Sequence, residues 1–116
     1  MTEQLQSVLG IAVPNSLLTS ALTHSSFAGE HPDVSDNERL EFLGDAVIEL
    51  AYREYLYVTY PHMSEGELAV LRSAAVREAS LAQRARLLNL GAYLRLGRGE
   101  ERNGGRDRDS ILADTF

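Results

Sequence analysis

Apolar residues recur along this chain roughly every three to four positions, as they do in helices, and no segment shows the alternation of a strand. Residues 5–9 predict a short first helix, which Gly10 ends. Pro14 opens a second helix that runs through residues 15–22. Residues 28–36 hold acidic side chains, a glycine and a proline, and predict a surface loop. The pattern indicates an all-α fold.

Two capping-box patterns mark the starts of longer helices. Residues 35–38 (Ser-Asp-Asn-Glu) predict a helix that Ser35 caps and that runs to about Tyr60, just before a proline. Residues 64–67 (Ser-Glu-Gly-Glu) repeat the spacing and predict helical structure to about residue 88, which a break near residues 75–77 can divide.

The last part of the chain is expected to be less regular. Gly91 ends the second helical region, and residues 93–96 form a short apolar piece. Residues 97–105 are rich in glycine and predict a loop. From Arg106 the chain leads into a final helical segment over residues 111–116.

The amino-acid composition limits the kinds of functional site that this chain can form. With 116 residues and 44% hydrophobic side chains, the chain is expected to form one domain with one core. The absence of cysteine excludes thiolate zinc sites, iron–sulfur clusters, thiol catalysis and disulfides, and leaves carboxylates and three histidines as candidate metal ligands. No apolar run is long enough for a membrane span and the start is not signal-like, so a cytoplasmic location is expected.

The net charge of −6 argues against binding to nucleic acid through overall charge. All eleven basic residues are arginines, however, and five of them fall near the C-terminus: Arg95, Arg98, Arg102, Arg106 and Arg108. This clustering indicates a region that faces an anion. A solvated loop in an arginine-rich protein is the alternative.

The long helix of residues 38–53 has two contrasting sides. Wound at about 100° per residue, it carries a core-facing stripe of four apolar residues, namely Leu40, Leu43, Val47 and Leu50. Glu38, Glu41 and Asp45 lie on the opposite side and repel one another, with no basic partner on that side before Arg53. Solvent alone can offset this repulsion, as on many acidic surfaces. Alternatively, Glu41 and Asp45 bind one hard divalent cation, Mg²⁺ or Mn²⁺.

Asp114 and Phe42 both have unexpected surroundings. Asp114 lies in the apolar segment 111–116, where an inward carboxylate is costly unless it is paired or metal-bound. Phe42 lies well off the apolar stripe of its helix, beside Glu38. Its ring either packs against another segment of the same chain or anchors a subunit interface.

Residues 37–47 (Asn-Glu-Arg-Leu-Glu-Phe-Leu-Gly-Asp-Ala-Val) resemble, nearly letter for letter, the signature helix of the ribonuclease III family. This family comprises divalent-metal endonucleases that cut double-stranded RNA. The resemblance covers essentially the whole chain and includes residues 21–26, 64–68, 71–72, 96–101, 104–106 and 109–114. It implies that residues 1–116 form the family's all-α endonuclease domain, which acts as a homodimer with RNA between the subunits.

The resemblance also implies roles for individual residues. Glu41, Asp45 and Asp114 match catalytic metal ligands for Mg²⁺, with Mn²⁺ as a substitute. Glu38 and Glu65 match supporting acidic positions that border the cleft. Phe42 matches an aromatic that family members insert into the partner subunit. The residues expected near the RNA backbone are Arg95, Arg98, Arg106, Arg108 and His24, although a helix-capping role for His24 is equally compatible with the sequence.

The implied activity is hydrolysis of double-stranded RNA to 5′-phosphate and 3′-hydroxyl ends, in RNA processing that includes ribosomal RNA precursors. The family's fourth metal ligand, a glutamate, would follow Phe116, where this chain ends. The rest of the endonuclease domain and the separate double-stranded-RNA-binding domain are also absent from it. We therefore expect a shortened form that cuts double-stranded RNA poorly or not at all.

Two other classes of function remain alternatives. One is a catalytically inactive family member that binds RNA or serves as a dimeric scaffold, although such members usually lose a helix carboxylate that this chain keeps. The other is an acidic helical bundle without nucleic acid, which leaves the carboxylates and Phe42 unexplained. Salt-dependent binding to double-stranded RNA separates this last class from the others.

Overall fold

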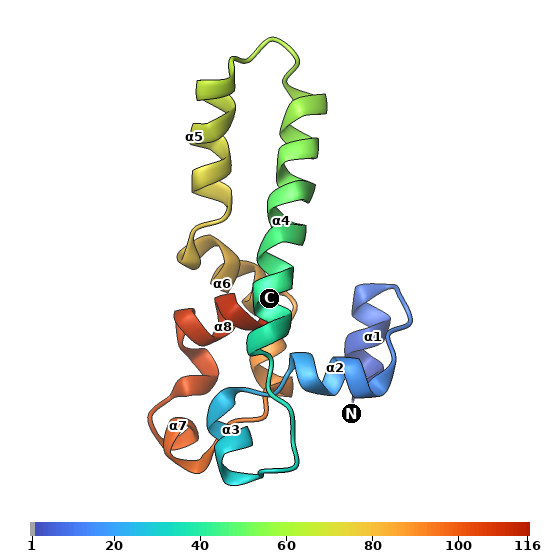
Figure 1. Ribbon diagram of the computed structural model, residues 1–116, viewed down its shortest axis with the longest axis vertical. Coiled ribbons are helices and arrows are strands. Elements are labelled where there is room, and N and C mark those ends of the chain that lie inside the picture. Colours follow the sequence, from blue (N-terminus) through green and yellow to red (C-terminus); the bar gives the residue numbers. More distant parts are fainter. Residues whose placement is uncertain (1) are drawn as a thin grey trace.

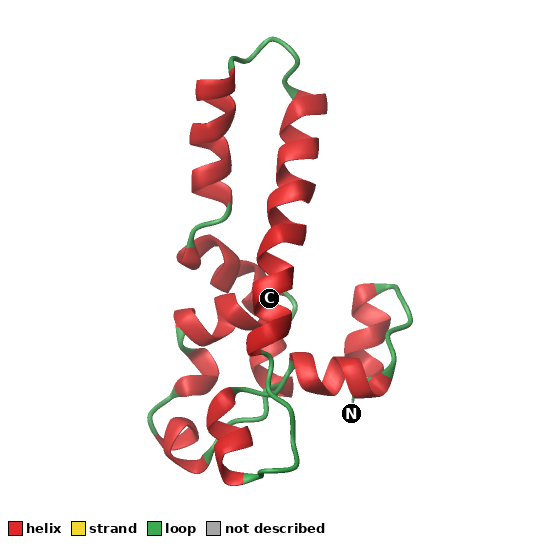
Figure 2. Cartoon of the chain, in the orientation of Figure 1, coloured by secondary structure: helices red, strands yellow, loops and turns green. Residues whose placement is uncertain are grey.

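The computed structural model describes residues 2–116, and across them the chain is helical with no named strand (Figure 2). The α-helices are α1 (Glu3–Leu9), α2 (Asn15–Ala21), α3 (Ser25–Glu30), α4 (Glu38–Thr59), α5 (Glu65–Ala75), α6 (Glu78–Leu87), α7 (Arg98–Arg102) and α8 (Asp109–Thr115). Two 3₁₀ turns, η1 (Leu90–Tyr93) and η2 (Gly105–Asp107), complete the fold. The all-α prediction is confirmed. None of the described helices is long and apolar enough to cross a membrane.

The hydrophobic core joins the two ends of the chain. Its buried members come from α1, α2, α6, η1, α8 and the segments beside them, and they are Leu5, Leu18, Leu22, Ala82, Ala85, Leu90, Leu94, Ile111 and Leu112. Two fully buried alanines in α6 let α8 pack closely against it. The core thus fixes the direction of α8.

The long helix α4 extends away from this core and forms a hairpin with α5 (Figure 1). The Arg72 guanidinium on α5 donates to the Glu49 carboxylate on α4 at 2.8 Å, and Arg53 pairs with the same carboxylate at 3.2 Å. Leu56 is the one residue of α4 that this chain buries. The molecule is therefore elongated, with extents of 50 × 30 × 23 Å.

The prediction that the apolar stripe of α4 faces the core is wrong for this chain. Leu43, Val47 and Leu50 are 61%, 60% and 68% exposed. The stripe has the expected helical spacing, but the core is built from other helices and α5 covers a different part of α4. Periodicity shows which side of a helix is apolar, and not which molecule covers it.

Several predicted boundaries are confirmed. Gly10 ends α1 with a φ of 71°, in the left-handed region that glycine tolerates. The Ser64 hydroxyl accepts from the Glu67 N–H at 3.2 Å and caps α5. The break expected near residues 75–77 separates α5 from α6.

Three local predictions are wrong. The predicted loop over residues 28–36 begins with the last turn of α3, and the predicted loop over residues 97–105 contains α7. Ser35 does not cap α4, since the helix begins after Asn37 and the Glu38 N–H donates to the Asp36 side chain at 3.0 Å.

Residues 21–24 connect the start of α4 to the segment before α7. The Asn37 side chain donates to the Ala21 carbonyl at 3.1 Å, and the Asn37 N–H donates to the Thr23 carbonyl at 2.9 Å. On the other side, the Arg95 N–H donates to the Leu22 carbonyl at 2.8 Å. Buried amides and carbonyls are costly to leave unpaired, so these bonds hold both segments in fixed places.

Candidate active site

Glu41, Asp45 and Asp114 are brought to one groove by α4 and α8. Glu41 and Asp45 lie one turn apart near the start of α4, and Asp114 lies in the last turn of α8. All three line a groove of about 370 Å³, with the apolar side chains of Leu17 and Val47 among its other walls. Residues far apart in the sequence therefore meet as the sequence predicts.

The orientation of Asp114 follows from packing. Ile111 and Leu112 point into the core and are 5% and 1% exposed, so the opposite side of α8 faces outward. Asp114 lies on this outer side and is exposed at the groove. The costly inward carboxylate that the apolar surroundings suggested does not occur.

The surroundings of Glu41 disfavour its ionised form. Burial raises the pKa of the Glu41 carboxyl above its ordinary value, and the negative charges of Asp114 and Asp45 raise it further. A hydrogen bond with Asp114 and the charge of Glu38 act in the same direction. Among residues 2–116, no arginine forms an ion pair with Glu41, Asp45 or Asp114. Within the described part of the chain, the site is thus an acidic cluster without a cationic partner.

The donor set fits a hard divalent cation. It consists of carboxylate oxygens, which Mg²⁺ and Mn²⁺ prefer. Among the described residues, no three carboxylates or imidazoles stand arranged to hold one metal ion as they are. Magnesium in enzymes is commonly held by one or two carboxylates together with water and substrate phosphate, so the cluster is compatible with such a site.

The two acids expected to support the site lie in different places. Glu38 begins α4, one turn before Glu41, and its charge acts on Glu41. The first turn of α5 lies at the far end of the hairpin (Figure 1). Glu65 is the first residue of this helix and lines a pocket with Arg53 and Tyr57. Within one chain, Glu65 therefore does not border the Glu41 cluster.

Phe42 is exposed to solvent in this chain. Its side chain is 84% exposed, the largest value among the exposed large hydrophobic residues of residues 2–116. The alternative in which the ring packs against another segment of its own chain is therefore wrong. The interface alternative stays a prediction.

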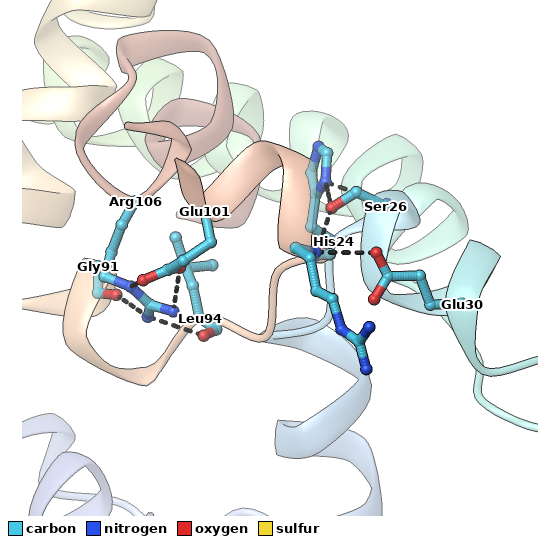
Figure 3. A network of polar contacts seen from close by, with 9 residues as sticks. His24, Ser26, Glu30, Gly91, Leu94, Glu101 and Arg106 are labelled. Atoms are coloured by element: carbon cyan, nitrogen blue, oxygen red, sulfur yellow. Dashed lines mark hydrogen bonds and ion pairs between the residues drawn. The ribbon is translucent and has the colours of Figure 1, made fainter. Parts of the chain in front are cut away.

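His24 is a capping residue. Its ring nitrogen Nδ1 accepts from the Ser26 N–H at 3.1 Å and lies 2.7 Å from the Ser26 hydroxyl (Figure 3). Because Nδ1 acts as an acceptor, the ring proton of neutral His24 is on Nε2. The capping alternative from the sequence describes this geometry, and a contact between Nε2 and RNA stays a prediction.

The arginines near the C-terminus differ in whether their guanidinium groups form hydrogen bonds or ion pairs with the described residues. The Arg106 guanidinium donates to the Gly91 and Leu94 carbonyls, each at 2.8 Å, and pairs with Glu101 at 2.6 Å (Figure 3). Arg108 pairs with Glu100 at 2.7 Å. We therefore do not carry Arg106 and Arg108 forward as RNA-contacting residues.

Arg95 and Arg98 remain available. The Arg95 guanidinium lies over the Phe27 ring, 4.3 Å from its centroid, and Phe27 in turn stacks on His31. Arg98 is exposed, and among the described residues its guanidinium has no ion pair or hydrogen bond.

Sequence reasoning missed two residues that position the site. Asn37 is 5% exposed and holds the start of α4 through two hydrogen bonds. Glu30, placed in a predicted loop, accepts from the Arg98 N–H at 2.8 Å. Asn37 is the first residue of the signature segment, which was a signal for its role. Glu30 carried no signal, because its partner is 68 residues away.

Comparisons with known proteins show a single family. A family model described as Ribonuclease-III-like matches residues 14–116. Proteins named Ribonuclease 3 from Natranaerobius thermophilus and Thermobifida fusca are 58% and 53% identical to the chain. Both alignments cover 97% of this chain, but 49% and 47% of those proteins. The chain thus spans about half the length of the curated relatives it matches.

Solved structures agree with the sequence comparison. The nuclease domain of ribonuclease III from Campylobacter jejuni is 43% identical and superposes with a TM-score of 0.92, over 99% of this chain and 78% of that one. That structure is described as flexible in a region involved in dimer formation. A second structure of the same domain, at 2.2 Å resolution, is 44% identical, has a TM-score of 0.89 and covers 97% of this chain and 75% of that one.

Proposed function

This chain belongs to the ribonuclease-III-like family, and on that premise we propose that it is an endonuclease that hydrolyses double-stranded RNA with the help of a divalent metal ion. The products carry 5′-phosphate and 3′-hydroxyl ends. The observation that carries the proposal is the acidic cluster of Glu41, Asp45 and Asp114, which has no cationic partner within the described chain.

Each carboxylate has a place in this chemistry. Glu41, Asp45 and Asp114 hold Mg²⁺, or Mn²⁺ in its place, and Glu38 adds negative charge one turn away. A bound divalent ion lowers the pKa of attacking water and stabilises the leaving oxygen of a phosphodiester. The chain contributes by fixing α4 through Asn37 and α8 through the core, which keeps the three carboxylates at one groove.

We further propose that the chain acts as a homodimer through the exposed face of α4. Leu43, Val47 and Leu50 are all at least 60% exposed on this face, and the exposed ring of Phe42 lies on the adjoining side of the helix. An isolated soluble protein rarely leaves such a contiguous apolar surface uncovered. Double-stranded RNA then lies between the two subunits and is recognised by its shape, phosphates and 2′-hydroxyls.

The proposed biological setting is the cytoplasm, where precursors of ribosomal RNA and other structured RNAs are processed. The inactive alternative shares the dimer and the RNA contact but not the hydrolysis. No feature of the carboxylate cluster favours it, since Glu38, Glu41 and Asp45 are all present.

The test is cleavage of a perfect RNA duplex by the chain in excess over RNA, with and without Mg²⁺. Protein in excess reveals slow cleavage as well as fast. We expect magnesium-dependent fragments that an RNA ligase can rejoin, because ligation requires a 5′-phosphate and a 3′-hydroxyl. Salt-dependent binding without any cleavage would instead support the inactive scaffold, and no binding would support a helical bundle without nucleic acid.

A further inference from the structure

We propose that Arg98 and Arg102, one turn apart on α7, form a phosphate-binding pair for the RNA backbone, held at a fixed offset from the carboxylate cluster by α3 and residues 21–24. This inference rests on the proposed function for the identity of the ligand. It adds Arg102 to the RNA contacts expected from the sequence and replaces Arg106 and Arg108.

The first argument is the charge balance of α7. Its two acids, Glu100 and Glu101, could neutralise the arginines of the same helix. They are instead engaged from outside, Glu100 by Arg108 at 2.7 Å and Glu101 by Arg106 at 2.6 Å. The downstream arginines thus form ion pairs with the acids of α7, and among the described residues the guanidinium groups of Arg98 and Arg102 have no partners.

The second argument is the state of those two arginines. Both Arg98 and Arg102 are exposed, and among the described residues neither guanidinium has an ion pair or a hydrogen bond. Side chains four residues apart lie on one side of a helix, as neighbours. Two adjacent, unpaired guanidinium groups suit phosphate oxygens, which accept parallel hydrogen bonds from this planar fork.

The third argument is that α7 is held tightly by α3. The Ser26 hydroxyl accepts from the Gly97 N–H at 2.8 Å, and a Glu30 carboxylate oxygen accepts from the Arg98 N–H at 2.8 Å (Figure 3). Gly97 is so close that an added Cβ would lie 2.6 Å from the Ser26 carbonyl oxygen. The first turn of α7 therefore has a fixed position on α3.

The fourth argument links α7 to the carboxylates. The His24 N–H donates to the Arg95 carbonyl at 3.0 Å, just before α7, while the adjacent Thr23 carbonyl accepts from Asn37 at the start of α4. Thr23 is fully buried. Residues 22–24 thus bond both to the segment just before α7 and to the start of α4, the helix of Glu41. A phosphate bound by α7 therefore fixes where the RNA backbone meets the carboxylates.

The experiment measures how the affinity for a perfect RNA duplex depends on salt, in EDTA so that binding is separated from cleavage. The variants are Arg98→Gln and Arg102→Gln, with Arg77→Gln as the control, because it removes the same charge from an exposed arginine between α5 and α6. Each lost phosphate contact lowers the slope of log affinity against log salt by about one. We expect this reduction for the first two variants and the wild-type slope for Arg77→Gln. Equal slopes in all four proteins, or an equal fall in all three variants, would overturn the pair.

The positioning role of Glu30 is tested by Glu30→Gln and Glu30→Ala. Both remove the charge, but only glutamine keeps an oxygen that can accept from the Arg98 N–H. We expect several-fold weaker duplex binding for Glu30→Ala than for Glu30→Gln, with both variants folded by circular dichroism. A merely electrostatic effect of Glu30 predicts equal affinities, and that result would overturn the positioning role.

Cleavage and binding report on different claims. If the wild type cuts the duplex in Mg²⁺ but the slopes of Arg98→Gln and Arg102→Gln are unchanged, the pair is wrong and the endonuclease proposal stands. If the slopes fall but no cleavage occurs, the pair stands and the endonuclease proposal is wrong. A wild type that binds no duplex even at low salt overturns both.

Discussion

Glu41 occupies surroundings that disfavour its own charge. Burial and the neighbouring carboxylates raise the pKa of Glu41 above 4.5, its ordinary value. The folded state then binds this proton more tightly than the unfolded state does, so folding stability from this group falls as pH rises from 4.5 through the raised pKa. At neutral pH, the ionised Glu41 carboxylate therefore lowers the free energy of unfolding of the metal-free protein.

Replacing the charge should therefore stabilise the metal-free protein. Glu41→Gln is expected to unfold at higher urea concentration than the wild type at pH 7. At pH 4, below the ordinary pKa, the wild-type carboxyl is largely protonated in both states and the difference should nearly vanish. Urea unfolding in EDTA at the two pH values measures it. An equal difference between the urea midpoints of the two proteins at both pH values would mean that the charge of Glu41 does not cause the difference.

Asp45 permits a test of the ligand role that leaves the fold intact. It is exposed on α4, and Asp45→Ala introduces a better helix former and removes like-charge repulsion. We expect magnesium-dependent cleavage to fall at least a hundredfold, with unchanged circular dichroism. Glu54→Ala is the control, since it removes an exposed acid of the same helix far from the groove. Cleavage by Asp45→Ala at the wild-type rate would exclude Asp45 as a ligand.

At the level of elements, the contact between α3 and α7 depends on Gly97, which has no side chain. Gly97→Ala would place Cβ 2.6 Å from the Ser26 carbonyl oxygen and 2.9 Å from Glu30. Such overpacking costs about 1–3 kcal/mol. Gly99→Ala, within α7 itself, meets nothing within 4 Å and is the control. Urea unfolding should show a loss of stability for Gly97→Ala and none for Gly99→Ala. Equal stabilities of the two variants would mean that α3 and α7 separate without a measurable loss of stability.

The elements that sequence predicted best are those whose signals are local. The long helix α4 follows from its periodicity and the proline beyond it, and α5 from the Ser64 cap. The short helices α3 and α7 were placed in loops because their support is distant. Ser26 meets Gly97 across 71 residues, and no local pattern encodes that bond.

The candidate site shows the same division. The carboxylates on α4 share a local spacing, and Asp114 joined them through the family resemblance; the structure brings all three to one groove. Which arginines are free could not be predicted, because Arg106 and Arg98 look alike in the sequence. Their difference arises from the carbonyls of Gly91 and Leu94, which are positioned by the fold.

At the scale of the whole molecule, the proposed dimer through α4 would make the stability of the protein depend on its concentration. Phe42→Ala should leave the stability of the monomer within about 0.5 kcal/mol, because a side chain that is 84% exposed contributes little to its own fold. The proposed dimer should weaken by about 2 kcal/mol or more. Sedimentation over a range of concentrations measures this.

Leu87→Ala is the control for the dimer measurement, since Leu87 is 79% exposed and lies on α6, a different helix from that of Phe42. It should leave the association unchanged. A Phe42→Ala variant that associates like the wild type would remove Phe42 from the interface.

The joining of both chain ends in one core also sets an order of events during synthesis. Leu5 and Leu18 are made early, whereas Ile111 and Leu112, in the same core cluster, are made much later. At about 5–20 residues per second, a ribosome takes on the order of ten seconds to make the intervening chain. During this interval the apolar sides of α1, α2 and α4 are all uncovered, and transiently exposed apolar surface favours aggregation. The core closes only after α8 has left the ribosome, so the helices made first wait unpacked for the last one.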